Sequence, residues 1–152
     1  MKFNPDCIRD VMLTLEEELT ISEETDNMFR FQAMSPNRLA LLVESRNGRT
    51  REDVVYSLLQ LIESRYVVTT AEYPLYGHFE LVELGKILYI TPKGHEFITS
   101  VQDKETWSKK ISPILKKMGG ASLAVIEAVA KGFANAMLDK IDFSSLPASE
   151  SP

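Results

Sequence analysis

The stretch Arg49–Phe97 restricts the possible folds of this chain more than any other. It starts with an amphipathic helix predicted over Arg51–Arg65. β-Branched and aromatic residues then predict one strand over Arg65–Thr70 and a second over Phe79–Ile90, with a break at Pro74 between them. A Pro-Lys-Gly sequence starts the next helix. The rest of the chain therefore has to complete an architecture of helix, antiparallel ribbon and helix.

The central helix of this stretch has a clear start and a clear apolar side. Thr50 is expected to cap it, because its hydroxyl can accept a hydrogen bond from the free amides of the first turn. Apolar residues at positions i, i+3, i+4 and i+7 predict the buried face: Val55, Leu58, Leu59 and Ile62. The opposite face is expected to carry mostly polar side chains: Arg51, Glu52, Tyr56, Gln60 and Glu63.

Two further helix starts precede the central helix. Asn4-Pro5 and Ser35-Pro36 each place a capping side chain before a proline at the first helical position, where the missing amide costs nothing. Asn47-Gly48 then favours a tight turn into the central helix, because glycine adopts positive φ easily. Two adjacent helices joined by a tight turn are thus expected in the middle of the domain.

The segment between the first two helices is predicted to contain a loop and a strand. Thr20–Asn27 is polar and acidic, which favours a loop, whereas Met28–Met34 alternates apolar and polar residues as a strand does. The order is then helix, strand, helix, turn, helix, strand, wing, strand. We expect a mainly helical α+β fold, with a winged helix-turn-helix domain over residues 1–101.

Residues 102–141 are predicted to form a helical tail. In Asp103–Met118 the helical spacing continues across Pro113, which either kinks one helix or starts another that Ser112 caps. In the next helix, Ala121–Ile141, three of four stripes are apolar, which predicts contact with a second copy, most simply as a homodimer. Candidate interface residues are Ala124, Val125, Ala128, Val129, Gly132, Phe133, Ala136 and Met137. Residues 142–152 are Ser/Pro-rich and predicted to be disordered.

The net charge of −5 is unevenly distributed along the chain. Residues 1–27 hold two basic and eight acidic side chains, so no domain-wide basic field attracts a phosphate backbone. DNA binding therefore requires a local patch on the turn and the central helix, with Lys86 or His78 on the wing. The candidate DNA-binding residues are Arg46, Arg49, Arg51, Tyr56, Gln60 and Lys86. The acidic N-terminal run is typical of a solvated surface, or it mimics nucleic acid or docks on a basic partner.

Residue types that support catalysis or metal binding are sparse. The single cysteine, Cys7, precedes apolar helix positions and is expected in the core, and the two histidines lack metal-ligand spacing. Trp107 is likewise expected to anchor the core. We expect no enzyme activity, no cofactor and no metal. No apolar run is long enough for a signal peptide or a membrane span, which predicts a cytoplasmic protein that binds no membrane.

A resemblance to a known family rests on three short segments. Ile90–Ile98 has the pattern Ile-Thr-x-x-Gly-His-Glu-Phe-Ile, Asp103–Trp107 has Asp-Lys-x-x-Trp, and Asn4–Asp10 opens the chain. Together they resemble the YjcQ-like winged-helix proteins and their domain-of-unknown-function relatives, which are short bacterial and prophage proteins. The resemblance implies a winged helix followed by a helical tail and no catalytic or binding residues. The chain departs from the family pattern at Pro92, usually an aromatic there, and at Pro113.

Two functional hypotheses follow from the sequence. The first is a dimeric winged-helix transcriptional regulator of bacterial or prophage origin that binds double-stranded DNA; it draws on the common use of this fold. The second is a non-catalytic protein-interaction module, such as a phage accessory protein acting on a host or defence factor, which keeps the winged fold without binding DNA. The nearly neutral central helix and the acidic N-terminus favour the second hypothesis, but the common use of the fold makes the DNA-binding regulator our prediction and the interaction module its alternative.

Overall fold

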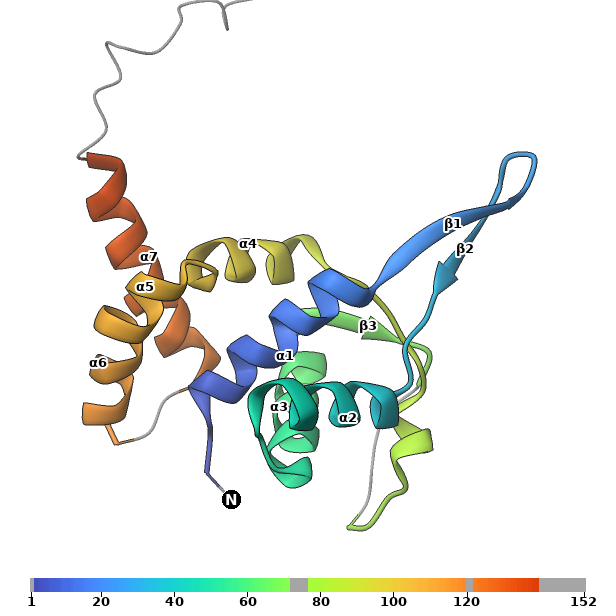
Figure 1. Cartoon of the computed structure of the whole chain (residues 1–152), viewed down its shortest axis with the longest axis horizontal. Helices are drawn as coiled ribbons and strands as arrows, with labels where there is room; N and C mark the ends of the chain where they lie inside the picture. Colours follow the sequence, from blue (N-terminus) through green and yellow to red (C-terminus); the bar gives the residue numbers. More distant parts are fainter. Residues whose placement is uncertain (1, 72–76, 120–121, 140–152) are drawn as a thin grey trace, which may run out of the picture.

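A computed structural model describes residues 2–71, 77–119 and 122–139, and the side chains of 137–139 lie outside the description. The fold is mainly helical with two small antiparallel sheets, so the expected α+β class is confirmed (Figure 1). The elements are α1 (Pro5–Glu18), β1 (Thr20–Thr25), β2 (Met28–Gln32), α2 (Pro36–Asn47), α3 (Arg51–Glu63), β3 (Val67–Thr69), the 3-10 turn η1 (Leu81–Leu84), β4 (Ile87–Ile90), α4 (Pro92–Val101), α5 (Lys104–Thr106), the π-helical turn η2 (Trp107–Ile111), α6 (Ser112–Lys117) and α7 (Leu123–Asp139).

The four helix starts predicted for the first hundred residues are confirmed. Each capping side chain accepts a hydrogen bond from the amide three residues further on, which satisfies one of the free donors of the first turn. In three of the helices a proline follows the cap directly, as expected for a residue without an amide proton. The caps are Asn4, Ser35, Thr50 and Thr91.

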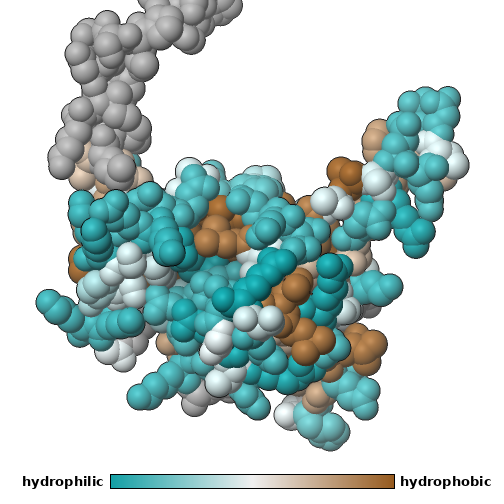
Figure 2. Space-filling view, viewed as in Figure 1, coloured by the Kyte–Doolittle hydropathy of each residue, from teal (hydrophilic) through white to brown (hydrophobic). Residues whose placement is uncertain are grey.

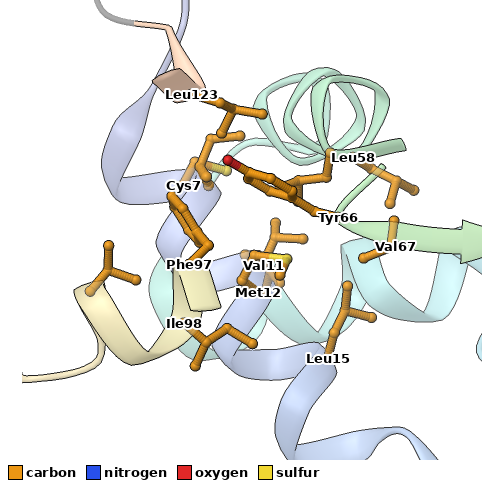
Figure 3. Close-up of a cluster of buried hydrophobic side chains, with 14 of the residues drawn as sticks. Cys7, Val11, Met12, Leu15, Leu58, Tyr66, Val67, Phe97, Ile98 and Leu123 are labelled. Carbon is orange, nitrogen blue, oxygen red and sulfur yellow. The ribbon is translucent and has the colours of Figure 1, made fainter. Parts of the chain in front are cut away.

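Helix α1 is the centre of the hydrophobic core. It contacts α2, α3, α4 and α6, and its buried side chains meet those of the other elements in one cluster (Figure 3). The ring of Tyr66, which follows α3, lies 5.2 Å from the ring of Phe97 on α4. Cys7 and Trp107 are buried, at 0% and 4% exposure, as predicted. The first and last parts of the described chain therefore share one core.

The buried face of α3 differs from the prediction. Leu58 is buried as expected, but Val55, Leu59 and Ile62 are only half-buried. The fully buried apolar neighbours of Leu58 are Val54 and Leu61. Ser57 is also buried, because it lies on the same side of the helix between them. Apolar residues cover nearly half of the helix circumference, so the periodicity alone left the centre of the buried face ambiguous.

The segment Thr20–Asn27, predicted to be a loop, is instead strand β1 and the start of a turn. It pairs with β2 in an antiparallel hairpin, with Ile21 opposite Phe31. Asn27 closes the turn at φ 61°, in the left-handed region that asparagine tolerates better than most residues. This hairpin, residues 20–32, projects away from the rest of the molecule and is called the arm below (Figure 1). The adjacent Glu23 and Glu24 interrupt the alternation of apolar and polar residues that marks a strand, so the sequence did not predict β1.

The predicted ribbon after α3 is confirmed only in its inner part. Strands β3 and β4 pair antiparallel, but Phe79–Ile90 becomes a strand only at Ile87. Before it, Glu80 and Glu83 form a capping box on the 3-10 turn, which shortens the strand. Met34 adds an isolated bridge to Ile87, which links the end of the arm to this sheet. The predicted turn at Pro74 lies outside the described residues.

The tail continues through Pro113 without a break. Because proline has no amide to donate, the chain widens into a π-helical turn just before it, with the Ser112 amide bonded to the Trp107 carbonyl oxygen. Ser112 does not cap a new helix; its hydroxyl donates to Asp6 on α1 instead. Helix α7 then packs against α4. The predicted disordered segment, residues 142–152, and the expected end of the last helix at Ile141 lie outside the described residues.

A matched pair of glycines tests this packing. A methyl group at Gly94 would collide with the Tyr66 carbonyl oxygen and lie 2.7 Å from Ile90 Cγ2, whereas one at Gly132 on α7 meets nothing within 4 Å. We expect Gly94→Ala to lower the free energy of unfolding by about 1–3 kcal/mol. Gly132→Ala should raise it by up to about 1 kcal/mol, because alanine favours the helix. Urea denaturation measures both; a Gly94→Ala protein as stable as the wild type would contradict the packing.

Candidate interaction surfaces

The three arginines predicted to bind DNA lie at the corner where α2 turns into α3. Gly48 ends α2 at φ 67°, and Thr50 begins α3 two residues later. Arg46 lies at the end of α2, Arg49 in the turn and Arg51 at the start of α3, and we call these three residues the arginine corner. The sequence predicted two adjacent helices joined by a tight turn here, and the structure has them as α2 and α3.

Each arginine of the corner forms an ion pair within the chain. Arg46 Nη2 lies 2.6 Å from Glu18 Oε1 on α1, and a second nitrogen lies 3.4 Å from Glu17. Arg51 Nη1 lies 3.6 Å from Glu44 Oε1 on α2 and also donates to Asn37. Acidic residues of α1 and α2 therefore neutralise much of the charge that a phosphate backbone would meet.

The third arginine is part of the domain's framework. Arg49 Nε donates to Asp10 Oδ2 at 2.7 Å, and the Asp10 side chain is only 10% exposed. Burial raises the pKa of Asp10, and the guanidinium of Arg49 opposes that rise by stabilising the ionised carboxylate. Turning Arg49 outward toward a ligand would leave a nearly buried carboxylate without its partner, so this side chain holds the corner against α1.

The remaining candidate DNA-binding residues are spread around the same face. Tyr56 and Gln60 are half-buried on α3, whose exposed charges are those of Arg51, Glu52 and Glu63. Lys86 is exposed at the start of β4; it lines a shallow depression with Asn37, the residue that binds Arg51. His78 is exposed near the start of the second part of the wing. The structure thus brings Lys86 close to the arginine corner but places acidic side chains on α3 itself.

Helix α7 covers its own domain more fully than the sequence indicated. Its buried residues are Leu123, Ile126 and Ala130, which face α4 and the core. Burial and the carboxylate of Glu127 on α7 together raise the pKa of Tyr66, which marks a polar contact between this helix and the domain. The helix is thus folded back onto the domain that precedes it.

The predicted interface residues of α7 therefore take other positions within one chain. Val125, Val129 and Phe133 are half-buried against the core rather than fully buried. The small-residue row is exposed: Ala124, Ala128, Gly132 and Ala136. Neither set is fully buried within the single chain, because the Ile126 side of the helix faces the domain. Met137 lies outside the described side chains, and a subunit contact through the exposed row stays a prediction.

The arm carries a large exposed apolar surface that the sequence did not reveal. Ile21, Phe29 and Phe31 share one face, because Ile21 opposes Phe31 and the paired residues of a hairpin point to the same side. They are 58%, 62% and 42% exposed, and Met28 near the tip is 61% exposed. Hydrophobic atoms gather at the root of the arm in Figure 2. Exposed apolar side chains in such number make the arm a candidate interaction surface.

The root of the arm continues this surface onto the domain. Phe31 stacks on Tyr89 of β4, with ring centroids 5.2 Å apart. Below the stack lies a depression of about 180 Å³, lined by the end of α1, the base of the arm, β4 and the start of α4. The signal that could have found this site is the spacing of Ile21, Phe29 and Phe31 around the Asp26-Asn27 turn.

Catalytic and metal chemistry have little support in the described part of the chain. No group of three His, Cys, Asp or Glu residues there could hold a metal ion. Burial raises the pKa of the Cys7 thiol to about 11, so the thiolate needed for a nucleophile or ligand is disfavoured at neutral pH. Among the described helices none is long and apolar enough to cross a membrane.

The fold and these surfaces define a small, mainly helical α+β protein with a corner between α2 and α3, a projecting hairpin and a docked helical tail. The family described as hypothetical protein DUF2513 matches residues 2–121, and the chain belongs to this uncharacterised family. The match covers the domain, the arm and the tail up to the region between α6 and α7. Neither the curated proteins nor the solved structures contain a significant match.

The two kinds of ion pair at the arginine corner should respond differently to mutation. We expect Arg49→Ala to lower the free energy of unfolding by about 3–5 kcal/mol, because it strands the nearly buried Asp10 carboxylate. Arg46→Ala removes an exposed pair and should cost about 0–1 kcal/mol. Urea titrations followed by the fluorescence of the single tryptophan, Trp107, measure both. Equal and small losses would show that Arg49 is not part of the framework.

Proposed function

We propose that this chain is a non-catalytic protein-interaction module with a winged-helix fold. The order of elements supports this fold: α1, the Met34 bridge in the place of a first strand, the α2–α3 corner, and the ribbon β3–β4 with a wing between its strands. The YjcQ-like relationship, a prophage origin and a cytoplasmic location fit the same proposal. On this view the winged domain is a scaffold that presents the arm.

One observation carries the choice of a protein over DNA as the partner. All three arginines of the corner already pair with acidic side chains of α1 and α2. Binding of a phosphate backbone gains most of its free energy from exposed cations that release counterions, and these side chains would first have to leave their partners. The apolar face of the arm has no such competing contact in the described part of the chain. A protein suits that face better.

A dimeric DNA-binding regulator is the second candidate, and a specific observation favours it. Arg51 and Lys86 both border the start of α2, through Asn37, on the side of the helix-turn-helix. In winged-helix proteins that bind DNA, the second helix of the motif enters the major groove and neighbouring cations fix its register on the phosphates. The exposed Glu52 and Glu63 on α3 oppose this use.

A DNA titration separates the two candidates. Fluorescence anisotropy would be measured on labelled duplexes, both random-sequence pools and fragments of the source genome. As a protein-interaction module, the chain should cause no saturable rise up to about 10 μM protein at about 150 mM salt, well above the range of specific DNA-binding proteins. Glu52→Lys, which adds a cation to the exposed side of α3, serves as a positive control for non-specific attraction.

The opposite result is equally well defined. A regulator would bind a subset of duplexes tightly, and Arg49→Ala and Arg51→Ala would each lower the salt slope by about one. That outcome would overturn the interaction module. Because Arg49→Ala is also expected to be less stable, its folded state would be checked by circular dichroism at the titration temperature.

A further inference from the structure

We propose that the arm of one copy docks on the exposed face of α6 in a second copy, so that two chains form a reciprocal dimer. The inference rests on the proposed function, because it names the protein that the arm binds. The two surfaces, the arm and α6, lie at opposite ends of the molecule (Figure 1). Both expose apolar side chains, and their charges are opposite.

The two faces of the arm are chemically different. On the polar face Arg30 pairs with Glu24 at 3.1 Å, and Gln32 donates to Ser22 at 2.6 Å, so these side chains satisfy one another. The opposite face carries the three exposed apolar residues described above and Glu23, which lies opposite Phe29. Glu23 takes part in no ion pair among the described residues. The arm thus offers an apolar strip with an uncompensated carboxylate.

The exposed face of α6 has the complementary character. We define the α6 face by four exposed residues at helical spacing along η2, α6 and the C-cap of α6: Lys110, Ile114, Lys117 and Met118. Ile114 is 38% and Met118 53% exposed, although both are large apolar side chains. The neighbouring Lys109 and Lys116 pair with Glu105 and Asp6, but Lys110 and Lys117 form no ion pair in the part of the chain that the structure describes. Apolar contact and two unpaired cations would both suit the arm.

Charge decides which surface of a second copy the arm meets. The arm holds Glu23, Glu24 and Asp26 against a single basic residue, Arg30, so two arms placed together would repel. The exposed row of α7 consists only of small side chains, and Lys131 is the single basic residue of this helix as described. The α6 face combines exposed apolar area with basic side chains. Electrostatic complementarity of this kind selects the partner surface and excludes the like-charged one.

The positions of the two surfaces allow both contacts to form at once. The arm and α6 lie at opposite ends of the molecule in Figure 1. When two copies lie side by side and antiparallel, a twofold axis places each arm at the α6 end of the other copy. A single contact between a hairpin and a short helix is small for a stable interface, but the axis doubles the buried area. The resulting dimer is closed and does not grow further.

A charge exchange tests the dimer. Sedimentation velocity at about 5 and about 200 μM protein would give the dimer dissociation constant for the wild type and its variants. We expect a dimer at the higher concentration. Glu23→Lys and Lys117→Glu should each weaken it about tenfold or more by placing like charges together, and the protein that carries both should recover most of the loss. Glu63→Lys makes the same charge change on α3 and should leave the dimer unchanged.

The apolar part of the contact has its own variant and its own alternatives. Phe29→Ser should abolish the dimer at about 200 μM without changing the thermal unfolding of the domain, because Phe29 lies in the exposed arm. A wild type that is monomeric at that concentration would overturn the inference and leave the proposed function intact. A dimer lost in Ala128→Glu but not in Glu23→Lys would also overturn it, in favour of α7. Tight duplex binding would overturn the proposed function itself.

Discussion

Three polar residues on the first helix hold the parts of this protein together. Asp6 accepts hydrogen bonds from the Trp107 indole and from a tail hydroxyl, which ties down the tail. Arg9 donates to backbone carbonyls at the end of α4, and its guanidinium lies over the Trp107 ring. Asp10 holds the helix-turn-helix corner through Arg49. A buried polar group without a partner costs free energy, so removing one of these contacts also weakens the network to which the others belong.

These contacts limit the ligands that the arginine corner can bind. Arg49, in the turn between α2 and α3, is engaged with α1, and its neighbours Arg46 and Arg51 are paired with acids of α1 and α2. The arm, which these contacts do not involve, keeps an apolar surface available. Under the proposed function, a domain whose cations stabilise its own fold, and whose hydrophobic residues are exposed elsewhere, is organised for contact with protein. The tail adds the basic, half-apolar counterpart at the far end.

Local chemistry explains what the sequence could predict. Caps such as Asn4 and Thr91 act within one helical turn, so their residues alone locate the helix starts. The pairing of Asp10 with Arg49 spans 39 residues and depends on the packing of α1, which no spacing rule contains. The arm was hidden for a related reason: its stability lies in cross-strand pairs such as Ile21 with Phe31, while its glutamates resemble a solvated loop.

The most direct test of the account locates the arm in the complex. A spin label on Asp26→Cys at the tip of the arm reports on nearby nuclei, and the buried Cys7, with its raised thiol pKa, should stay unlabelled at neutral pH. Labelled protein would be mixed with unlabelled, nitrogen-15-enriched protein, so that only contacts between copies broaden the amide signals. The account predicts broadening over residues 110–118. Broadening confined to α7 or to the arginine corner, or none at all, would contradict it.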